Sequence, residues 1–187
     1  KGNVLLDWRE LRGWGTGAEN YYRGDKVGRG SLKGYYTMDQ QAPAQIENKR
    51  YRMQWRHQSK LSRDTTLTTE LNGLSDASFL KDYFFRDEYE RAAFPDNYVS
   101  VITAKPGYTL SFLDRERLDP FFTVVERSPE VRFDTHNRAF AQTPFYFREE
   151  IQFSNLQKKY ANSDAELHAV RLDTNHTLTT TGRGTLS

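Results

Sequence analysis

The residues with the chemistry for catalysis or metal binding are four histidines and three pairs of carboxylates. The histidines are His57, His136, His168 and His176, and no two of them have the spacing of a metal-binding motif. The chain has no cysteine, which excludes thiolate ligands, thiol nucleophiles and disulfides. The histidines therefore predict local hydrogen bonding rather than a metal site.

The carboxylate pairs are Glu149 with Glu150, Asp82 with Asp87, and Asp114 with Glu116. A glycoside hydrolase needs two carboxyl groups at a defined separation in space, and spacing along the chain does not fix that separation. The glycines of GWGTG are not followed by a helix start, so they form neither a nucleophile elbow nor a phosphate loop. We expect no catalytic residue, no metal ligand and no cofactor.

Composition predicts an ordered but polar chain. The 187 residues are 36% hydrophobic and 14% aromatic, and disordered chains usually lack aromatic residues. The 27 basic and 25 acidic residues are interspersed, which argues against a nucleic-acid partner, since such a partner needs clustered Lys and Arg. No run reaches the ~18 apolar residues of a transmembrane helix, although β-strands of about 9–11 residues also cross membranes with a weaker signal.

Alternation of polar and apolar residues is the strongest structural pattern. In Arg50–His57, aromatic and apolar side chains alternate with charged and amide side chains, which is typical of a β-strand with two different faces. Similar patterns predict about ten strands, at Asn3–Arg12, Thr16–Arg23, Arg29–Met38, Arg50–Gln58, Asp64–Asn72, Tyr98–Ala104, Gly107–Leu113, Glu130–Thr135, Pro144–Asn155 and Ala165–Leu178. We expect an all-β, antiparallel up-and-down meander that forms one segment over residues 1–187.

The alternation assigns side chains to two faces. The apolar face is predicted to carry Tyr51, Met53, Trp55, Leu67, Leu71, Tyr108, Leu110, Phe112, Phe145, Phe147, Ile151 and Phe153. The polar face is predicted to carry Arg52, Gln54, Arg56, Glu70, Arg148, Glu150 and Gln152. Glu149 interrupts the apolar row, and we expect a bulge or a membrane interface there.

Residues 75–96 are predicted to form a long structured loop with one or two helical turns, with Ser75 as a possible N-cap. Connections of this length are often functional. Its Tyr83, Phe84 and Phe85 are expected to pack against the sheet.

Large aromatic residues admit two interpretations. Trp8, Trp14, Tyr21, Tyr22, Tyr35, Tyr36, Tyr51 and Trp55 are expected near strand ends. They fit either the core of a sandwich or an aromatic girdle at a bilayer interface. The rows of charged side chains exclude a dry interior on their own face of the sheet, because burying unpaired charge is costly. They therefore face either bulk solvent or the hydrated lumen of a large barrel.

Three stretches give the chain a specific resemblance. The first runs from Arg50 to Phe84, with matching positions at Trp55, His57, Asn72, Ser75, Asp76, Phe79, Leu80 and Asp82. The second is ERSPEVRFDTHNRAFAQTPFYFREEIQFSNL, with Glu126, Pro129, Val131, Phe133, Tyr146 and Phe153, and the third is Arg171–Thr181. In order and spacing they resemble the outer-membrane lipopolysaccharide-assembly family LptD, also called organic solvent tolerance protein.

The resemblance implies a fold and a function. The family has a periplasmic jellyroll followed by a very large β-barrel, and this chain would be an interior part of the barrel, without the jellyroll or the gate strands. The implied function is non-catalytic transport of lipopolysaccharide into the outer leaflet of the Gram-negative outer membrane. Implied partners are lipopolysaccharide, membrane lipids, an outer-membrane lipoprotein plug and the periplasmic lipopolysaccharide-transport bridge.

Within this resemblance the two faces acquire roles. The apolar face would contact lipid and the polar face would line the lumen, while Ser75, Asp76, Phe79, Asp82 and Tyr83 would belong to a loop that plugs it. Arg at Leu67 or Phe112 would then destabilise the barrel by about 2–4 kcal/mol at mid-membrane.

Two other classes remain open. A soluble all-β carbohydrate-binding module using exposed aromatic residues predicts a stable monomer in buffer. A hydrolase on a β-scaffold predicts activity that is lost on mutating Glu149 or Glu150.

Overall fold

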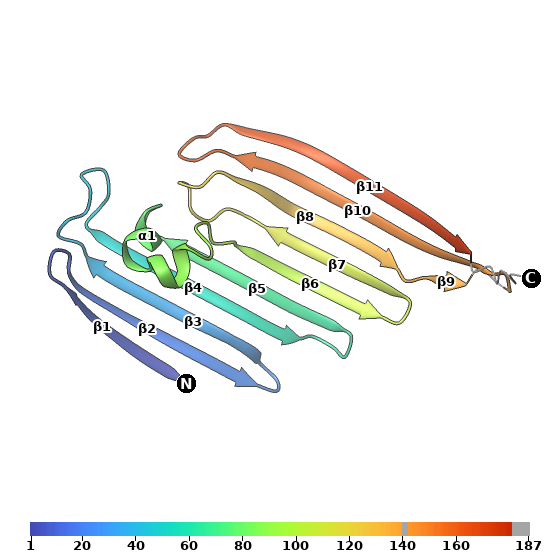
Figure 1. Ribbon diagram of the computed structural model, residues 1–187, viewed down its shortest axis with the longest axis horizontal. Coiled ribbons are helices and arrows are strands. Elements are labelled where there is room, and N and C mark those ends of the chain that lie inside the picture. Colours follow the sequence, from blue (N-terminus) through green and yellow to red (C-terminus); the bar gives the residue numbers. More distant parts are fainter. Residues whose placement is uncertain (140–141, 181–187) are drawn as a thin grey trace, which may run out of the picture.

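The chain forms one open antiparallel sheet, seen in a computed structural model that describes residues 1–139 and 142–180 (Figure 1). The strands are β1 Gly2–Arg9, β2 Gly13–Gly24, β3 Gly28–Met38, β4 Lys49–Lys60, β5 Thr65–Leu74, β6 Tyr98–Lys105, β7 Tyr108–Arg115, β8 Val124–Thr135, β9 Arg138–Ala139, β10 Phe145–Lys159 and β11 Glu166–Thr180. Each long strand pairs with the next in sequence, and the short β9 pairs only with β10. The predicted all-β up-and-down meander is confirmed, and the sheet does not close on itself.

The strands are longer than the alternation predicted, except β1, which ends at Arg9 and not at Arg12. β8 begins at Val124, six residues before its predicted start, because the register shift opposite β7 between Leu113 and Arg115 interrupts the period of two. A second register shift, between Ser154 and Leu156, interrupts the pairing of β10 with β8. Glu149 keeps regular pairing with His176 on β11, but on the other side of β10 the register changes by one residue between the pairs Glu150–Asp134 and Phe147–Arg138. The expected irregularity at Glu149 is therefore present on the β8 and β9 side, and the alternative of a membrane interface there stays a prediction. Thr181, the last residue of the third stretch, lies outside the described residues.

The two ends of the sheet differ in their connections. At the long-loop end the connections are residues 10–12, 39–48, 75–97, 116–123 and 160–165. At the short-turn end they include residues 25–27, 61–64 and 106–107. The loop between β5 and β6 contains α1, Phe79–Tyr83, and a π-helical turn, Phe85–Tyr89. Figure 1 shows this helical segment lying over the sheet near β3, β4 and β5.

The helical turns predicted within residues 75–96 are thus present. Ser75 is not the N-cap of α1, because that position belongs to Ser78, which makes no side-chain capping bond. The Ser75 hydroxyl instead donates to the carboxylate of Asp76 at 2.8 Å. The N-cap thus lies three residues after the predicted one, at a serine that the sequence analysis did not consider.

Candidate functional site

Beneath the loop, the two faces of the sheet are buried in the reverse of the usual order. On β4 the polar-face side chains Arg50 and Arg52 lie under the loop and are 0% and 5% exposed, whereas Arg56, further along the same face, is exposed. On the apolar face of the same strand, Met53 is 60% exposed and Tyr51 49% exposed. A soluble domain normally buries its apolar face. Here the loop covers charge and leaves the hydrophobic surface open.

The register places the predicted residues consistently on these faces. All twelve predicted apolar-face side chains lie on one face, linked through cross-strand pairs such as Trp55–Leu71 and Phe112–Val131. All seven predicted polar-face side chains lie on the other, as in the pairs Arg56–Glu70 and Gln152–Arg132. That the first face meets lipid and the second a lumen stays a prediction.

Two of the aromatic residues expected in a girdle lie on the polar face. Tyr21 pairs with Ser31, and Tyr35 pairs with Arg52. In YY dipeptides the two rings point to opposite sides of the strand, so only Tyr22 and Tyr36 lie on the apolar face. Trp8 and Trp14 do share that face at the long-loop end, where their ring centroids are 5.0 Å apart.

Arg50 is the centre of the site beneath the loop. Its Nε donates to Asp76 Oδ2 at 2.9 Å and its Nη2 to Asp76 Oδ1 at 2.8 Å, a bidentate pair. Its Nη1 donates to Asp39 at 2.8 Å and to Asp82 at 2.8 Å, and its Nη2 also reaches the Ser78 hydroxyl at 3.0 Å. One guanidinium thus joins the residue after β3 to residues just before α1 and within it.

A second arginine shares these carboxylates. Arg12, in the connection after β1, lies 2.7 Å from Asp39 and 3.4 Å from Asp82. Arg9 donates to the backbone carbonyl oxygens of Asp82 and Tyr83 at 3.2 and 3.0 Å. We call Arg12, Asp39, Arg50, Asp76, Ser78 and Asp82 the Arg50 cluster. It ties the loop to β1, β3 and β4 at once.

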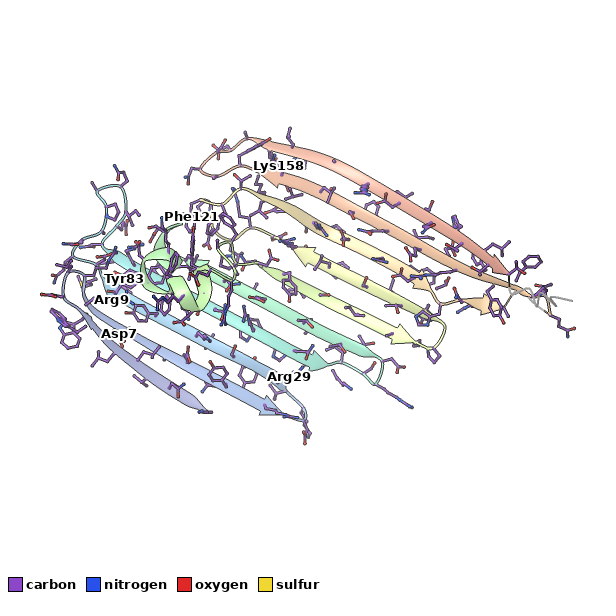
Figure 2. The ribbon with its side chains drawn as sticks, in the orientation of Figure 1. Asp7, Arg9, Arg29, Tyr83, Phe121 and Lys158 are labelled. Atoms are coloured by element: carbon purple, nitrogen blue, oxygen red, sulfur yellow. The ribbon has the colours of Figure 1, made fainter. Side chains whose placement is uncertain are left out.

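Aromatic rings surround this cluster. Tyr35 on β3 lies 6.3, 6.0 and 5.2 Å from the rings of Phe79, Tyr83 and Phe84, and its hydroxyl donates to Asp7 at 3.1 Å. The Arg50 guanidinium lies 5.6 Å from the Phe79 ring and 5.2 Å from the Tyr83 ring, within range of a cation–π interaction. Figure 2 shows Tyr83 beside Arg9 at this end of the sheet. The predicted packing of Tyr83 and Phe84 is confirmed, whereas Phe85 is 46% exposed and stacks on Tyr89.

The carboxylates of the cluster are held in the charged form. Burial by itself would raise the pKa of Asp76, but hydrogen bonds from Arg50, Ser75 and Ser78 outweigh it and lower that pKa. Burial likewise opposes ionisation of Asp39, and its bonds from Arg50 and the backbone of Gln41 bring its pKa below the ordinary value. The cluster is therefore an ion network at neutral pH.

A second contact closes the edge of β5 beyond the point where β6 begins. The pairing of β5 with β6 ends at Glu70 and Tyr98. Further along β5, the backbone N–H of Asn72 donates to the side-chain oxygen of Asn97 at 2.5 Å, and the backbone N–H of Leu74 donates to the carboxylate of Asp119 at 3.3 Å. Side chains thus take the place of a neighbouring strand along this part of β5. Burial raises the pKa of the Asp119 carboxyl.

The loop residues predicted as a plug all take part in these contacts. Asp76 and Asp82 bind Arg50, Ser75 binds Asp76, and Phe79 and Tyr83 form the aromatic layer. Sequence reasoning missed Arg50, Asp39 and Arg12 as their partners. The available signal was Arg50 itself, which continues the row of Arg52, Gln54 and Arg56 into the region next to the loop.

His57 and His176 make local contacts with neighbouring side chains. Within residues 1–139 and 142–180, no group of three metal-ligating side chains comes together. His57 Nδ1 lies 2.8 Å from the Tyr22 hydroxyl, which accepts from the Trp55 indole at 3.0 Å, and Glu149 lies 3.4 Å from His176. These are local polar contacts on the apolar face. The part of the chain that is described also holds no helix with the length and apolar character of a membrane span.

Neither family models nor the curated proteins contain a match to this chain.

Proposed function

We propose that this chain is a wall segment of an outer-membrane β-barrel that assembles lipopolysaccharide into the outer leaflet. The observation that carries the proposal is the inverted burial, with Arg50 fully covered while Met53 on the same strand is 60% exposed. The same face also exposes Leu32, Phe112 and Leu172, and an exposed hydrophobic surface that spans several strands marks a site of interaction with a partner or a membrane. A membrane wall would place the apolar face against hydrocarbon and the polar face against water.

Strand length and connections support the same interpretation. The long strands contain 8 to 15 residues, and about 9–11 residues cross a bilayer when tilted. Outer-membrane barrels have short periplasmic turns and longer extracellular loops. The long-loop end, with the Arg50 cluster, would therefore face the cell exterior. Because a sheet in hydrocarbon cannot leave its edges unpaired, β1 and β11 would pair with further strands.

The lipopolysaccharide step rests on the resemblance to the LptD family, and the polar face supplies its physical basis. A hydrated, charged wall partly covered by a loop suits the passage of a polar headgroup. The loop segment would narrow the lumen at its outer end.

The wall is tested by neighbouring substitutions on β7. Phe112→Arg places a charge on the apolar face, and Ser111→Arg places the same charge on the polar face. We expect Phe112→Arg to lower the free energy of unfolding in lipid vesicles by about 2–4 kcal/mol if the site is near mid-membrane, and Ser111→Arg to change it by much less. Equal effects would contradict the assigned faces. A protein that is monomeric in buffer without detergent would favour the soluble carbohydrate-binding module instead.

The lipopolysaccharide role needs its own experiment. In Gram-negative cells, depletion of the full-length protein should reduce the amount of newly made, pulse-labelled lipopolysaccharide that reaches the surface. Re-expression of the protein should restore it, and re-expression of the Phe112→Arg variant should not. Normal delivery in depleted cells would refute the transport role while leaving the barrel intact.

A further inference from the structure

At the short-turn end of the sheet, the polar face holds two arginines that lie directly opposite each other. Arg23 on β2 and Arg29 on β3 are register partners beside the Gly24–Gly28 turn. Figure 2 shows Arg29 close to the short-turn end, far from Tyr83 and the loop. Like charges directly opposite on neighbouring strands destabilise a sheet. The pair therefore needs a reason other than stability.

Neither arginine is neutralised by the protein around it. Arg29 donates from Nε at 2.9 Å to the amide oxygen of Gln58, an uncharged acceptor. No carboxylate forms a salt bridge with Arg23 or Arg29 among the residues that the structure describes. Four residues away on the same two strands and the same face, opposite charges do pair, because Lys33 lies 3.3 Å from its register partner Glu19.

A row of side chains next to the arginines completes a trough. The cross-strand partners are, in order from β2 to β6, Tyr21, Ser31, Arg56, Glu70 and Tyr98. Two tyrosine rings therefore stand at the ends of the row, with the small Ser31 and the nearby Thr68 between the larger side chains. A hollow of about 500 Å³ lies over this row and includes Arg23 and Arg29 in its lining.

The trough continues toward the short-turn end and is positively charged. A second hollow of about 440 Å³ shares Arg23, Arg29 and Gln58 with the first and adds Lys60. The two linings together contain four cations, Arg23, Arg29, Arg56 and Lys60, and two carboxylates, Asp25 and Glu70, a net charge of +2. Arg56 and Glu70 neutralise each other, since Arg56 donates to Glu70 at 2.8 Å, and this leaves Arg23, Arg29 and Lys60 against Asp25.

We propose that this trough binds a phosphorylated sugar, with the phosphate between Arg23 and Arg29 and the sugar ring along the row from Tyr21 to Tyr98. Two guanidinium forks match the terminal oxygens of a phosphate, which carries about −1.5 to −2 charge at pH 7, whereas one carboxylate occupies a single fork. Tyrosine offers an apolar ring to a sugar's C–H face and a hydroxyl to its polar groups. The site lies beyond the transport role itself, because these contacts hold whether or not the opposite face meets lipid.

The test is a calorimetric titration of the full-length protein in detergent micelles with glucose 6-phosphate. We expect saturable binding that weakens at least tenfold in the double variant Arg23→Gln, Arg29→Gln. The matched control is Arg148→Gln, which removes a cation from the polar face of β10, outside the trough. It should bind like the parent protein.

Three further ligands separate the contributions. Glucose, inorganic phosphate and glucuronate should each bind at least tenfold more weakly than glucose 6-phosphate. Equal binding of inorganic phosphate would overturn the sugar part of the site, and equal binding of glucuronate would overturn the preference for phosphate. Unchanged binding in the double variant would overturn the site as a whole. Any of these results leaves the Phe112→Arg test of the membrane wall intact, so the two proposals fail separately.

Discussion

The polar face treats arginine in opposite ways at its two ends. At the long-loop end, Arg50 is fully buried and bonded to three carboxylates. At the short-turn end, Arg23 and Arg29 are exposed, face each other and have no carboxylate partner in the described part of the chain. The same strands β3 and β4 run through both regions. The contrast indicates that a charge with a complete set of internal partners holds structure, whereas a charge left without them is available to a ligand.

The largest expected effect is at the buried arginine. Arg50→Ala leaves Asp39, Asp76 and Asp82 without their main cation in a buried position, and breaking a buried ion pair costs about 3–5 kcal/mol. We expect a loss of this size in the free energy of unfolding, measured by denaturant titration in lipid vesicles. Arg50→Lys keeps the charge but loses the bidentate fork, so it should fall between the parent and Arg50→Ala. A parent-like Arg50→Ala would remove the distinction between the two ends.

Acid should also lower the free energy of unfolding, as Arg50→Ala does, because it protonates the carboxylates that bind Arg50. The folded-state pKa values of Asp39 and Asp76 lie below the ordinary value, so their contribution to stability is fully present above about pH 4 and is lost as pH falls through the folded-state values. We expect a lower free energy of unfolding at pH 2.5 than at pH 5, and a smaller difference in Arg50→Ala. Equal acid sensitivity in both proteins would place the titrating groups elsewhere.

Asp119 modifies this acid response. Its pKa is raised by burial, so the folded state favours the protonated form, and lowering the pH through this range adds stability. Asp119→Asn removes that opposing contribution, and the loss of stability between pH 5 and pH 2.5 should become steeper. The same unfolding titrations measure it, and a shallower loss would contradict the assigned sign.

A substitution at the short-turn end can give Arg29 a carboxylate partner, as Arg50 has at the long-loop end. Gln58 accepts from Arg29, and Gln58→Glu would turn this contact into an ion pair. We expect a gain of about 0.2–1 kcal/mol in unfolding free energy, the range of an opposite-charge cross-strand pair, together with weaker binding of glucose 6-phosphate. The control is Gln152→Glu on β10, which should leave binding unchanged. Tighter binding in Gln58→Glu would contradict the role given to the unpaired charge.

The smallest effect is expected from removing the like-charge pair. Arg23→Gln should stabilise the protein by a few tenths of a kcal/mol, because it relieves the repulsion with Arg29. Differential scanning calorimetry of the parent and variant measures it. A destabilised Arg23→Gln would mean that Arg23 has a structural contact of its own.

Much of this fold followed from the alternation of side chains. The period of two placed Arg52, Gln54 and Arg56 opposite Tyr51, Met53 and Trp55, and the register bears this out. The loop at residues 75–96 and its helical turns were also predictable, since no alternation continues through it. The register change beside Glu149 could be anticipated because Glu149 interrupts the hydrophobic pattern, whereas the shift between Ser154 and Leu156 depends on pairing with β8 and has no such signal.

The sequence by itself determined which side chains share a face, because successive residues of any strand point to opposite sides. It did not determine which cations are neutralised. Asp39, Asp76 and Asp82 reach Arg50 across 11, 26 and 32 residues, and Arg23 meets Arg29 only because a three-residue turn sets their register. Those distances are created when the loop folds back over the sheet and when the strands align. Only the tertiary structure therefore decided that Arg50 is bonded to three carboxylates and that Arg23 and Arg29 have no carboxylate partner in the described part of the chain.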